Sequence, residues 1–425
     1  MNKEPDQSTK DRPFNPFRTP KTHKMRAVVS EAIALLQSFE RDQQLRQRQR
    51  RPVDQKTFEE TVTAIICDLM HRAITDPEGW LSISRSKQHL GLNGRYQAVA
   101  MNETAPTILD RLTHSELSLV VMEVGNQFHG QQTTIKAGPR LRSWMVENDI
   151  GLEDLTQTPT QEVIILKRTK VGYWDMGETV DYQDTDLTHQ YRLEMQTINE
   201  WLASADIQFD PSILNEDRSK VDVNDRHLRR CFTQGLFQCG GRLFGGFWQP
   251  LHKWQRSQGI LIDGHKVTTL DYAQMAPRIL YGLTGEPLPM EDAYLIPGLE
   301  RHRDGVKKVL NAMLFADHQL NRFPKETRQL FPSYLRWSDV VGKIMDIHEP
   351  IKHSFFTGIG HQLQFTESNI MVDVLLGLKK QDVVGLPIHD AVIIPSSFTT
   401  QVTELMSSIF KAHTGLDSVV SKEVI

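Results

Sequence analysis

The stretch VTTLDYAQMAPRILYG, residues Val267–Gly282, changes abruptly from a strand pattern to a helix pattern. The run Val267–Leu270 is typical of a β-strand and ends at Asp271. A helical repeat begins at once, with Met275 and Ile279 on one face. A short buried strand that presents a carboxylate at its end, directly before a helix, is a suitable place to hold a metal ion.

A second stretch, VVGLPIHDAVIIP at Val383–Pro395, complements the first. Two apolar runs flank His389 and Asp390, which predicts two strands joined by a tight turn with an acid at its tip. Two carboxylates on strands are what a two-metal phosphoryl-transfer site requires. One metal activates the attacking hydroxyl, and the other stabilises the leaving oxygen. We therefore expect Asp271 and Asp390 to act together.

These stretches resemble two sequence motifs of the family A polymerases, the DNA polymerase I group. The pattern D-Y-x-Q-x3-R-I-L at Asp271–Leu280 resembles their motif A, and His389-Asp390 resembles their motif C. Between them, R-x3-K-x3-N-x3-F at Arg303–Phe315 resembles motif B, so the motifs occur in the family's order. The single-subunit phage RNA polymerases share the same palm. The resemblance covers residues 230–425 and is that of a small, divergent, primase-polymerase-like member.

The resemblance implies a metal site. Asp271 would bind two metal ions, Mg²⁺ or Mn²⁺, the backbone carbonyl of Tyr272 would complete one coordination shell, and Asp390 would bind the catalytic metal. His389 would contact nucleic acid. An aspartate before a helix often only caps the helix, which is the alternative for Asp271. The matching Asp390 favours metal binding.

The motif B stretch predicts a helix with a nucleotide-binding face. Four residues recur at steps of four and so share one face: Arg303, Lys307, Asn311 and Phe315. The resemblance implies that Lys307 neutralises the nucleotide's phosphates during catalysis, that Arg303 assists, and that Phe315 stacks near the templating base pair. Lys308 replaces Lys307 if the register shifts by one. The alternative is a solvated basic face, and Gly305 weakens the helix.

Ala276 departs from the DNA polymerase I pattern. The resembled enzymes carry a glutamate at this step, five residues after the motif A aspartate, and it packs against the sugar and excludes a 2′-hydroxyl. Alanine leaves room for that hydroxyl. The sequence therefore predicts weak discrimination against ribonucleotides at the nucleotide site.

Two further residues are candidates for nucleic-acid contact. Arg242 lies in the glycine-rich and aromatic-rich stretch Cys239–Arg256. This stretch resembles one that opens the palm of phage RNA polymerases, where the arginine approaches the nucleic-acid backbone. The alternative is a tight glycine hairpin with aromatic side chains in the core. Gln364 opens a helix before the hairpin, where the resembled family contacts the minor groove of the primer–template. A surface glutamine is the alternative.

The composition is that of a globular protein. The chain has 425 residues, 39% of them apolar, and neither a membrane-length apolar run nor a secretory signal is recognisable. Cys67, Cys231 and Cys239 show no zinc-ligand spacing, which favours a reducing, cytoplasmic location. Met1–Arg51 carries 12 Lys/Arg and 6 Asp/Glu, so its net charge is +6 and the remainder carries −10 of the total −4. Such a basic arm fits either an anionic partner or a solvated tail.

Four regions follow from these patterns. Residues 1–52 form a basic, partly disordered arm, with no regular structure over Met1–Lys24 and a helix over Ala27–Arg51. Residues 53–170 show the helix and strand rhythm of a winged-helix-like or thumb-like region, with a wing at Gly125–Gly130. This rhythm is common in DNA-binding and in protein-interaction modules. Residues 171–230 are a helical connector, and 231–425 are the palm and fingers.

The predicted fold is α+β, with a right-hand polymerase-type palm and fingers in the C-terminal half and a helical, winged-helix-like N-terminal region. The predicted function is template-directed nucleotidyl transfer as a DNA polymerase or a primase-like polymerase. Its partners would be a DNA template or primer and NTPs or dNTPs, with no membrane. One alternative is a non-catalytic nucleic-acid-binding replication or regulatory protein with a relic palm. Another is a nuclease, for which Glu367 is the nearby further acid.

Overall fold

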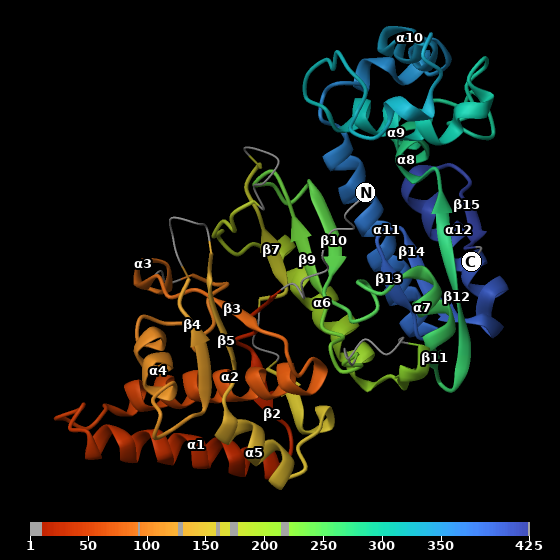
Figure 1. The fold of residues 1–425 in the computed structure, drawn as a ribbon. Coiled ribbons are helices and arrows are strands. Elements are labelled where there is room, and N and C mark those ends of the chain that lie inside the picture. Colours follow the sequence, from red (N-terminus) through yellow and green to blue (C-terminus); the bar gives the residue numbers. More distant parts are fainter. Residues whose placement is uncertain are drawn as a thin grey trace, which may run out of the picture. The chain divides into compact units, whose positions relative to one another are not determined.

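The computed structural model describes residues 11–91, 94–125, 131–158, 162–170, 177–213 and 221–423. Helices and strands are both well represented, so the α+β class is confirmed (Figure 1). The chain divides into two compact units. The N-terminal unit contains Met1–Glu162 and Leu214–Asn224, and the C-terminal unit contains Val163–Ile213 and Asp225–Ile425. None of the helices in the described ranges has the length and apolar character that a bilayer crossing requires.

The N-terminal unit is built around a helical core. Its helices are α1 (His23–Asp42), α2 (Pro52–Thr75), α3 (Lys87–Leu90), α4 (Ala105–Leu112) and α5 (Pro139–Glu147). The apolar stripe of α2 is buried, with Phe58, Val62 and Leu69 at most 2% exposed. These side chains join residues of α1, α4 and α5 in one apolar cluster, so helix packing holds this unit together.

Two small sheets complete the N-terminal unit. The first has the order β1 (Arg12–Pro13), β3 (Leu81–Ile83), β5 (Thr133–Ala137) and β4 (Val120–Glu123). The second pairs β2 (Arg18–Pro20) with β6 (Leu155–Gln157). Along the chain the elements run α2, β3, α3, α4, β4, β5. Of the wing expected between the last two strands, residues 126–130 lie outside the described residues.

The segment before α1 differs from the expectation. Residues 1–10 lie outside the described ranges, but residues 11–24 contain β1, β2 and the start of α1, so the prediction of no regular structure was wrong for them. The buried Asp68 carboxylate accepts a hydrogen bond from Arg12, at 2.6 Å, and one from the Asn15 amide, at 2.7 Å. These partners lie more than 50 residues from Asp68 in the sequence, so no local sequence pattern predicts the hydrogen bonds.

Helix α1 is shorter than the helix predicted over Ala27–Arg51, because it ends at Asp42. Phe39 is the last buried apolar residue of α1, and Leu45 beyond it is 47% exposed. A polar segment with no face to bury gains little from continuing as a helix.

The C-terminal unit is organised by the long strand β12 (His265–Ala273). The start of β12 pairs with β11 (Ile260–Ile262), its middle pairs with β14 (Ala391–Pro395) and its end pairs with β15 (Val419–Lys422). Strand β13 (Leu386–Ile388) extends the sheet beyond β14, and β8 (Ile207–Phe209) extends it beyond β11. The inner residues of β12 and β14 are buried, so this pairing is the core of the unit.

Helices and a second sheet surround this core. Helix α8 (Met275–Thr284) follows β12 and packs with α11 (Gly360–Lys380) and α12 (Thr399–Thr414). Strands β7 (Ile164–Leu166), β9 (Arg229–Phe232) and β10 (Gly240–Phe244) form a three-stranded sheet that packs on α11. The remaining helices near these sheets are α6 (Asp186–Ser204) and α7 (Lys253–Gly259).

Helices α9 (Arg303–Phe315) and α10 (Trp337–Ile347) gather beyond the end of β12 (Figure 1). Although Gly305 was expected to weaken α9, the helix is continuous through it. A Cβ at this position would lie 2.6 Å from the ring of Phe331, so the glycine lets that ring pack against α9. Gly305 therefore lowers the helix propensity of α9 but allows Phe331 to pack closely against it.

Gly305→Ala is expected to destabilise the C-terminal unit by about 1–3 kcal/mol, because the buried Phe331 ring has to move. Gly342→Ala in α10 is the matched control, since a Cβ there meets nothing within 4 Å. It should stabilise the helix by about 0.5–1 kcal/mol. Urea unfolding of both variants measures the difference. Equal effects of the two alanines would contradict the packing role of Gly305.

Candidate active site

A cavity of about 320 Å³ lies within the C-terminal unit. Among its lining residues are nine of the ten that the sequence singled out as site residues: Arg242, Asp271, Tyr272, Ala276, Arg303, Lys307, Phe315, Gln364 and Asp390. These residues come from β10, β12, α8, α9, α11 and the β13–β14 turn. His389 is the one that does not line the cavity.

Two neighbouring strands position the two aspartates. Asp271 is in register with Ala391, and the Tyr272 amide donates a hydrogen bond of 3.2 Å to the Asp390 carbonyl. Asp390 sits in a two-residue turn, since Ile388 pairs with Ala391. Helix α8 begins only at Met275, so Asp271 belongs to the strand and does not cap the helix.

The carboxylates of Asp271 and Asp390 repel each other when both are ionised. Burial, followed by the charge of Asp390, raises the pKa of Asp271 to about 7, although the charge of Lys307 acts to lower it. A partly buried acidic pair at the end of a strand holds more negative charge than its surroundings compensate. Oxygen ligands with this excess charge fit a divalent cation such as Mg²⁺.

The cations of α9 are held in two different ways. The Arg303 guanidinium donates to the Asp292 carboxylate at 2.6 Å and lies over the Tyr294 ring, 5.4 Å from its centroid. Lys307 lines the cavity and forms no ion pair within the described part of the chain. Lys308 does not line the cavity, so the register that places Lys307 inward is the one observed.

The far end of α9 places an aromatic ring at the cavity wall. The rings of Phe315 and His361 meet edge to face, with centroids 5.3 Å apart. A Cβ at Gly360 would lie 2.7 Å from the Phe315 ring, so only glycine gives the ring this position. Ala276 lines the same cavity from the first turn of α8. Phe315 therefore offers a fixed stacking face.

The glycine-rich stretch contains both of the roles considered for it. Trp248 is completely buried, and its indole donates to the Pro387 carbonyl at 2.9 Å, so this aromatic is part of the core. Arg242 instead lines the cavity, where its guanidinium forms a two-point ion pair with Glu367, at 2.6 and 3.0 Å. This pair joins β10 to α11.

His389 lies at the turn before Asp390, with φ of 54°, and its side chain is exposed. Its ring contacts Phe244 edge to face, with centroids 5.8 Å apart. The structure places both rings outside the cavity lining. A contact of His389 with nucleic acid remains a prediction.

Tyr294 is a cavity residue that sequence reasoning missed. It ends a turn that is fixed by long-range hydrogen bonds. Gln274 accepts from the Ala293 amide at 2.7 Å, the Ala293 carbonyl lies 2.9 Å from a His348 ring nitrogen, and Arg278 donates to the Glu291 carbonyl at 2.7 Å. Because the turn has no periodicity, no sequence signal points to Tyr294.

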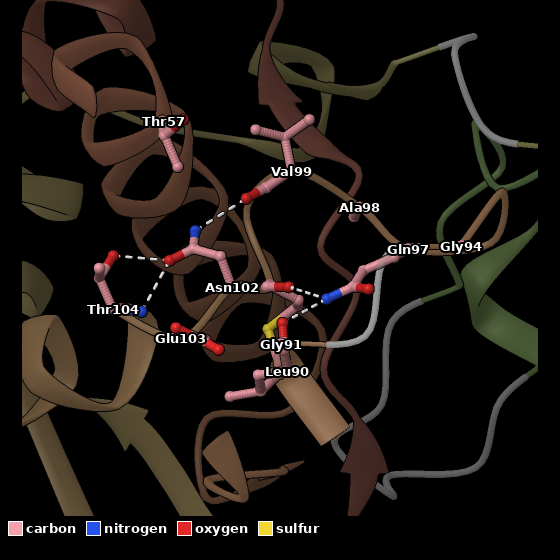
Figure 2. Close-up of a pocket in the computed structure, with 11 residues that line it drawn as sticks. Thr57, Leu90, Gly91, Gly94, Gln97, Ala98, Val99, Asn102, Glu103 and Thr104 are labelled. Atoms are coloured by element: carbon pink, nitrogen blue, oxygen red, sulfur yellow. Dashed lines mark hydrogen bonds between the residues drawn. The ribbon is translucent and has the colours of Figure 1, made fainter. Parts of the chain in front are cut away.

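A second cavity, of about 630 Å³, lies in the N-terminal unit (Figure 2). Its polar side chains mostly bond to their own surroundings. The Gln97 amide donates to the carbonyls of Leu90 and Met101, and the Asn102 carbonyl oxygen accepts from Thr104 (Figure 2). Glu103 is the one charged residue among its described lining residues. This composition does not support acid–base or metal chemistry.

The N-terminal unit also contains a buried pair that could help to hold a metal ion. A His71 ring nitrogen lies 2.8 Å from the Asp222 carboxylate. The same carboxylate forms an ion pair of 3.2 Å with the buried Arg18. An arginine on the carboxylate competes with a metal ion, so this pair is less suited to metal binding than the aspartates of the C-terminal unit.

Comparisons with known proteins give a likeness in structure and none in sequence. No protein-family model and no curated protein matches the sequence. Among solved structures, the chain is similar to the POL domain of Pol1 from M. smegmatis, solved as a complex with DNA primer-template and dNTP. The identity is 13%, the TM-score is 0.28, and the likeness covers 56% of this chain and 52% of that chain. The chain thus spans about half of that domain, and a likeness this low does not identify the function.

The pKa of Asp271 predicts an unusual pH dependence of stability. Its folded-state pKa, about 7, lies above the ordinary value of 3.8, so the ionised form destabilises the fold. The contribution of protonated Asp271 to the free energy of unfolding is fully present below about pH 4 and is lost as the pH rises through about 7. Asp271→Asn should therefore stabilise the metal-free protein at pH 8 by about 1–2 kcal/mol, after allowance for solvent screening. The gain should shrink at pH 5.

Thermal unfolding in EDTA at pH 5 and pH 8 measures this effect. Asp292→Asn is a control with the opposite sign. Although burial raises the pKa of Asp292, its hydrogen bond and ion pair with Arg303 lower that pKa overall. Removing its charge should therefore destabilise the protein at pH 8. A loss of stability in Asp271→Asn at pH 8 would contradict the strained carboxylate pair.

Proposed function

We propose that this protein is a template-directed nucleotidyltransferase that uses Mg²⁺ or Mn²⁺, as a DNA polymerase or a primase-like polymerase. The observation that carries the proposal is a single cavity with strand-borne carboxylates and helix-borne cations. Asp271 and Asp390 are on one side, and Lys307 and Arg303 come from α9. Nucleotidyl transfer needs acidic and basic side chains close together, because the acids hold the metal ions and the basic side chains hold the triphosphate.

The aspartates have one task in this proposal. Asp271 and Asp390 would hold the divalent ions, and the backbone carbonyl of Tyr272 would add an oxygen ligand. The bound metals supply acidification of the attacking hydroxyl and neutralisation of phosphate charge. The raised pKa of Asp271 supports this role, since metal binding relieves the repulsion between the two carboxylates.

The cations and the aromatic ring have a second task. Lys307 would donate to the triphosphate, and Arg303 would assist from its bond to Asp292, which fixes its position. Phe315 would stack near the nascent base pair. Arg242, Gln364 and His389 would contact the primer–template. Residues 231–425 would then be the palm and fingers of a right-hand polymerase core, with α9 as the fingers helix.

The N-terminal unit fits a supporting role better than base reading. Its element order, and the pairing of β5 with both β3 and β4, agree with a winged-helix-like region. In that arrangement α4 would be the recognition helix. The charged residues of α4 are already paired, since Asp110 binds Arg85 and Arg111 binds Glu40. We therefore propose that this unit acts as a thumb-like or protein-interaction module.

The nuclease alternative requires Glu367 as a third acidic metal ligand, and the structure does not leave this carboxylate available. Glu367 lines the cavity, but both of its carboxylate oxygens bind Arg242. A metal ion would have to displace that arginine. Primer synthesis distinguishes the proposed enzyme from the other alternative, which is a non-catalytic nucleic-acid-binding protein with a relic palm.

Primer synthesis and extension on single-stranded DNA test the proposed function. Wild-type protein with Mg²⁺ or Mn²⁺ and labelled NTPs or dNTPs should form product. Asp390→Asn should reduce the rate at least 1,000-fold, because it removes a metal ligand while keeping the side-chain shape. Absence of product from wild type, with DNA binding intact, would establish the non-catalytic protein.

The neighbouring lysines provide a matched control in the same assay. Lys307→Ala should raise the KM for the nucleotide at least tenfold, because it removes a phosphate partner. Lys308→Ala should leave KM within twofold, since Lys308 is exposed on α9 and does not line the cavity. Equal effects of the two substitutions would show that the effect is general surface charge.

Ala276 predicts the sugar preference. An alanine at this wall of the cavity leaves space beside a bound nucleotide's ribose, so wild type should accept NTPs at a rate within about tenfold of dNTPs. Ala276→Glu should reduce kcat/KM for NTPs at least tenfold more than for dNTPs. Ala276→Ser, which stays small, is the control. Strong dNTP selection by wild type, or no change in Ala276→Glu, would contradict this role.

A further inference from the structure

The ion pair between Arg242 and Glu367 forms part of the cavity wall. It is bidentate, with Nε donating at 2.6 Å and Nη2 at 3.0 Å, and the Glu367 side chain is only 6% exposed. Arg242 is 27% exposed and lines the cavity beside Asp271 and Asp390. A two-point arginine–carboxylate pair fixes both charge and orientation.

The backbone of β10 is shaped to make this pair. Gly241 has φ of 84°, and a Cβ there would lie 2.5 Å from the Ser368 hydroxyl of α11. Glycine therefore allows β10 to approach α11 closely, one residue before Arg242. The ladder between β10 and β9 shifts register at the same place, which turns the next side chain.

A different arginine, on the neighbouring strand β9, already joins the same sheet to α11. Arg230 of β9 is 1% exposed and donates to the Ser368 hydroxyl at 3.1 Å and to the Asn369 side chain. Arg230 does not line the cavity. Because the structural connection to α11 is made there, the pair at Arg242 and Glu367 is available for another purpose.

The charge balance of the cavity indicates that purpose. Its lining cations are Arg242, Arg303 and Lys307. Glu367 neutralises the first and Asp292 the second, while Lys307 has no ion-pair partner among the described residues. The Nη1 group of Arg242 bonds to no described residue, so it can still donate a hydrogen bond. A paired arginine can orient a strand without adding net attraction.

We propose that Glu367 is a positioning residue that limits the electrostatic grip of Arg242 on a nucleic-acid strand. Glu367 holds the guanidinium aimed into the cavity and cancels its charge, so the strand is located by a hydrogen bond and is released readily. This inference rests on the proposed function, because it requires a strand in the cavity. It predicts that affinity and its salt dependence change when the partner charge is removed.

The test measures binding of a labelled primer–template by fluorescence anisotropy from 50 to 200 mM KCl, without nucleotide. Glu367→Gln leaves the Arg242 charge uncompensated. It should tighten binding several-fold at 50 mM and steepen the slope of log K against log salt by about 0.9, the value for one added phosphate contact. Across this range the variant should lose about 3.5-fold more affinity than wild type.

Two further variants keep the test decisive if Glu367→Gln folds poorly. Arg242→Gln leaves the carboxylate unpaired, so binding should weaken and the slope should become shallower. Arg242→Gln with Glu367→Gln restores a neutral, hydrogen-bonded pair and should return the slope to that of wild type. Arg230→Gln is the structural control, and it should lower Tm without changing the slope.

The outcomes separate the two proposals. Equal losses in Arg242→Gln and in the double variant would show that Arg242 binds with its full charge, which overturns the role of Glu367. An unchanged slope in folded Glu367→Gln would do the same. If wild type neither binds primer–template nor synthesises product, the proposed function itself fails.

Discussion

The pairing of β12 with β14 is the constraint on which the C-terminal unit depends. It places Asp271 in register with Ala391, beside Asp390, and so brings two like charges together in a partly buried position. This placement is unfavourable by itself, and the raised pKa of Asp271 is its consequence. The cost is offset by apolar burial along the same ladder, where Leu270 and Val392 are at most 1% exposed. The apolar strands thus stabilise an acidic site at their ends.

The cations around the site are arranged so that they do not neutralise these aspartates directly. Arg303 is bound to Asp292, and Arg242 is bound to Glu367. An arginine bonded to Asp271 or Asp390 would satisfy the carboxylate and compete with a metal ion. Giving each arginine its own counterion keeps it ordered and leaves the acidic pair uncompensated. Under the proposed function, Lys307, a flexible point charge, would be the cation best able to follow a triphosphate.

The sequence predicted the parts of the site that are local. The β13–β14 turn follows from two apolar runs, and the inward face of α9 follows from four-residue spacing. Features that rest on distant contacts were not predictable. Arg242 meets Glu367 across 125 residues, and Arg12 meets Asp68 across 56 residues, which is why the bidentate pair and the ordered segment after residue 10 were missed. The sequence around a charged residue does not show whether it forms an ion pair with a buried residue far away in the chain.

The stretch after β12 shows that a residue of a sequence motif can have a structural role. Gln274 and Arg278 belong to the stretch that resembles motif A, yet both bond to the backbone of the turn before α9, and Arg278 bonds also to the Asp417 carbonyl. Gln274 accepts from the Ala293 amide, and Arg278, which is 6% exposed, donates to the Glu291 carbonyl. That turn carries Asp292, the counterion of Arg303. A substitution at Gln274 would therefore impair the site by displacing a cation that it never touches, and a loss of activity alone would not identify it as a catalytic residue.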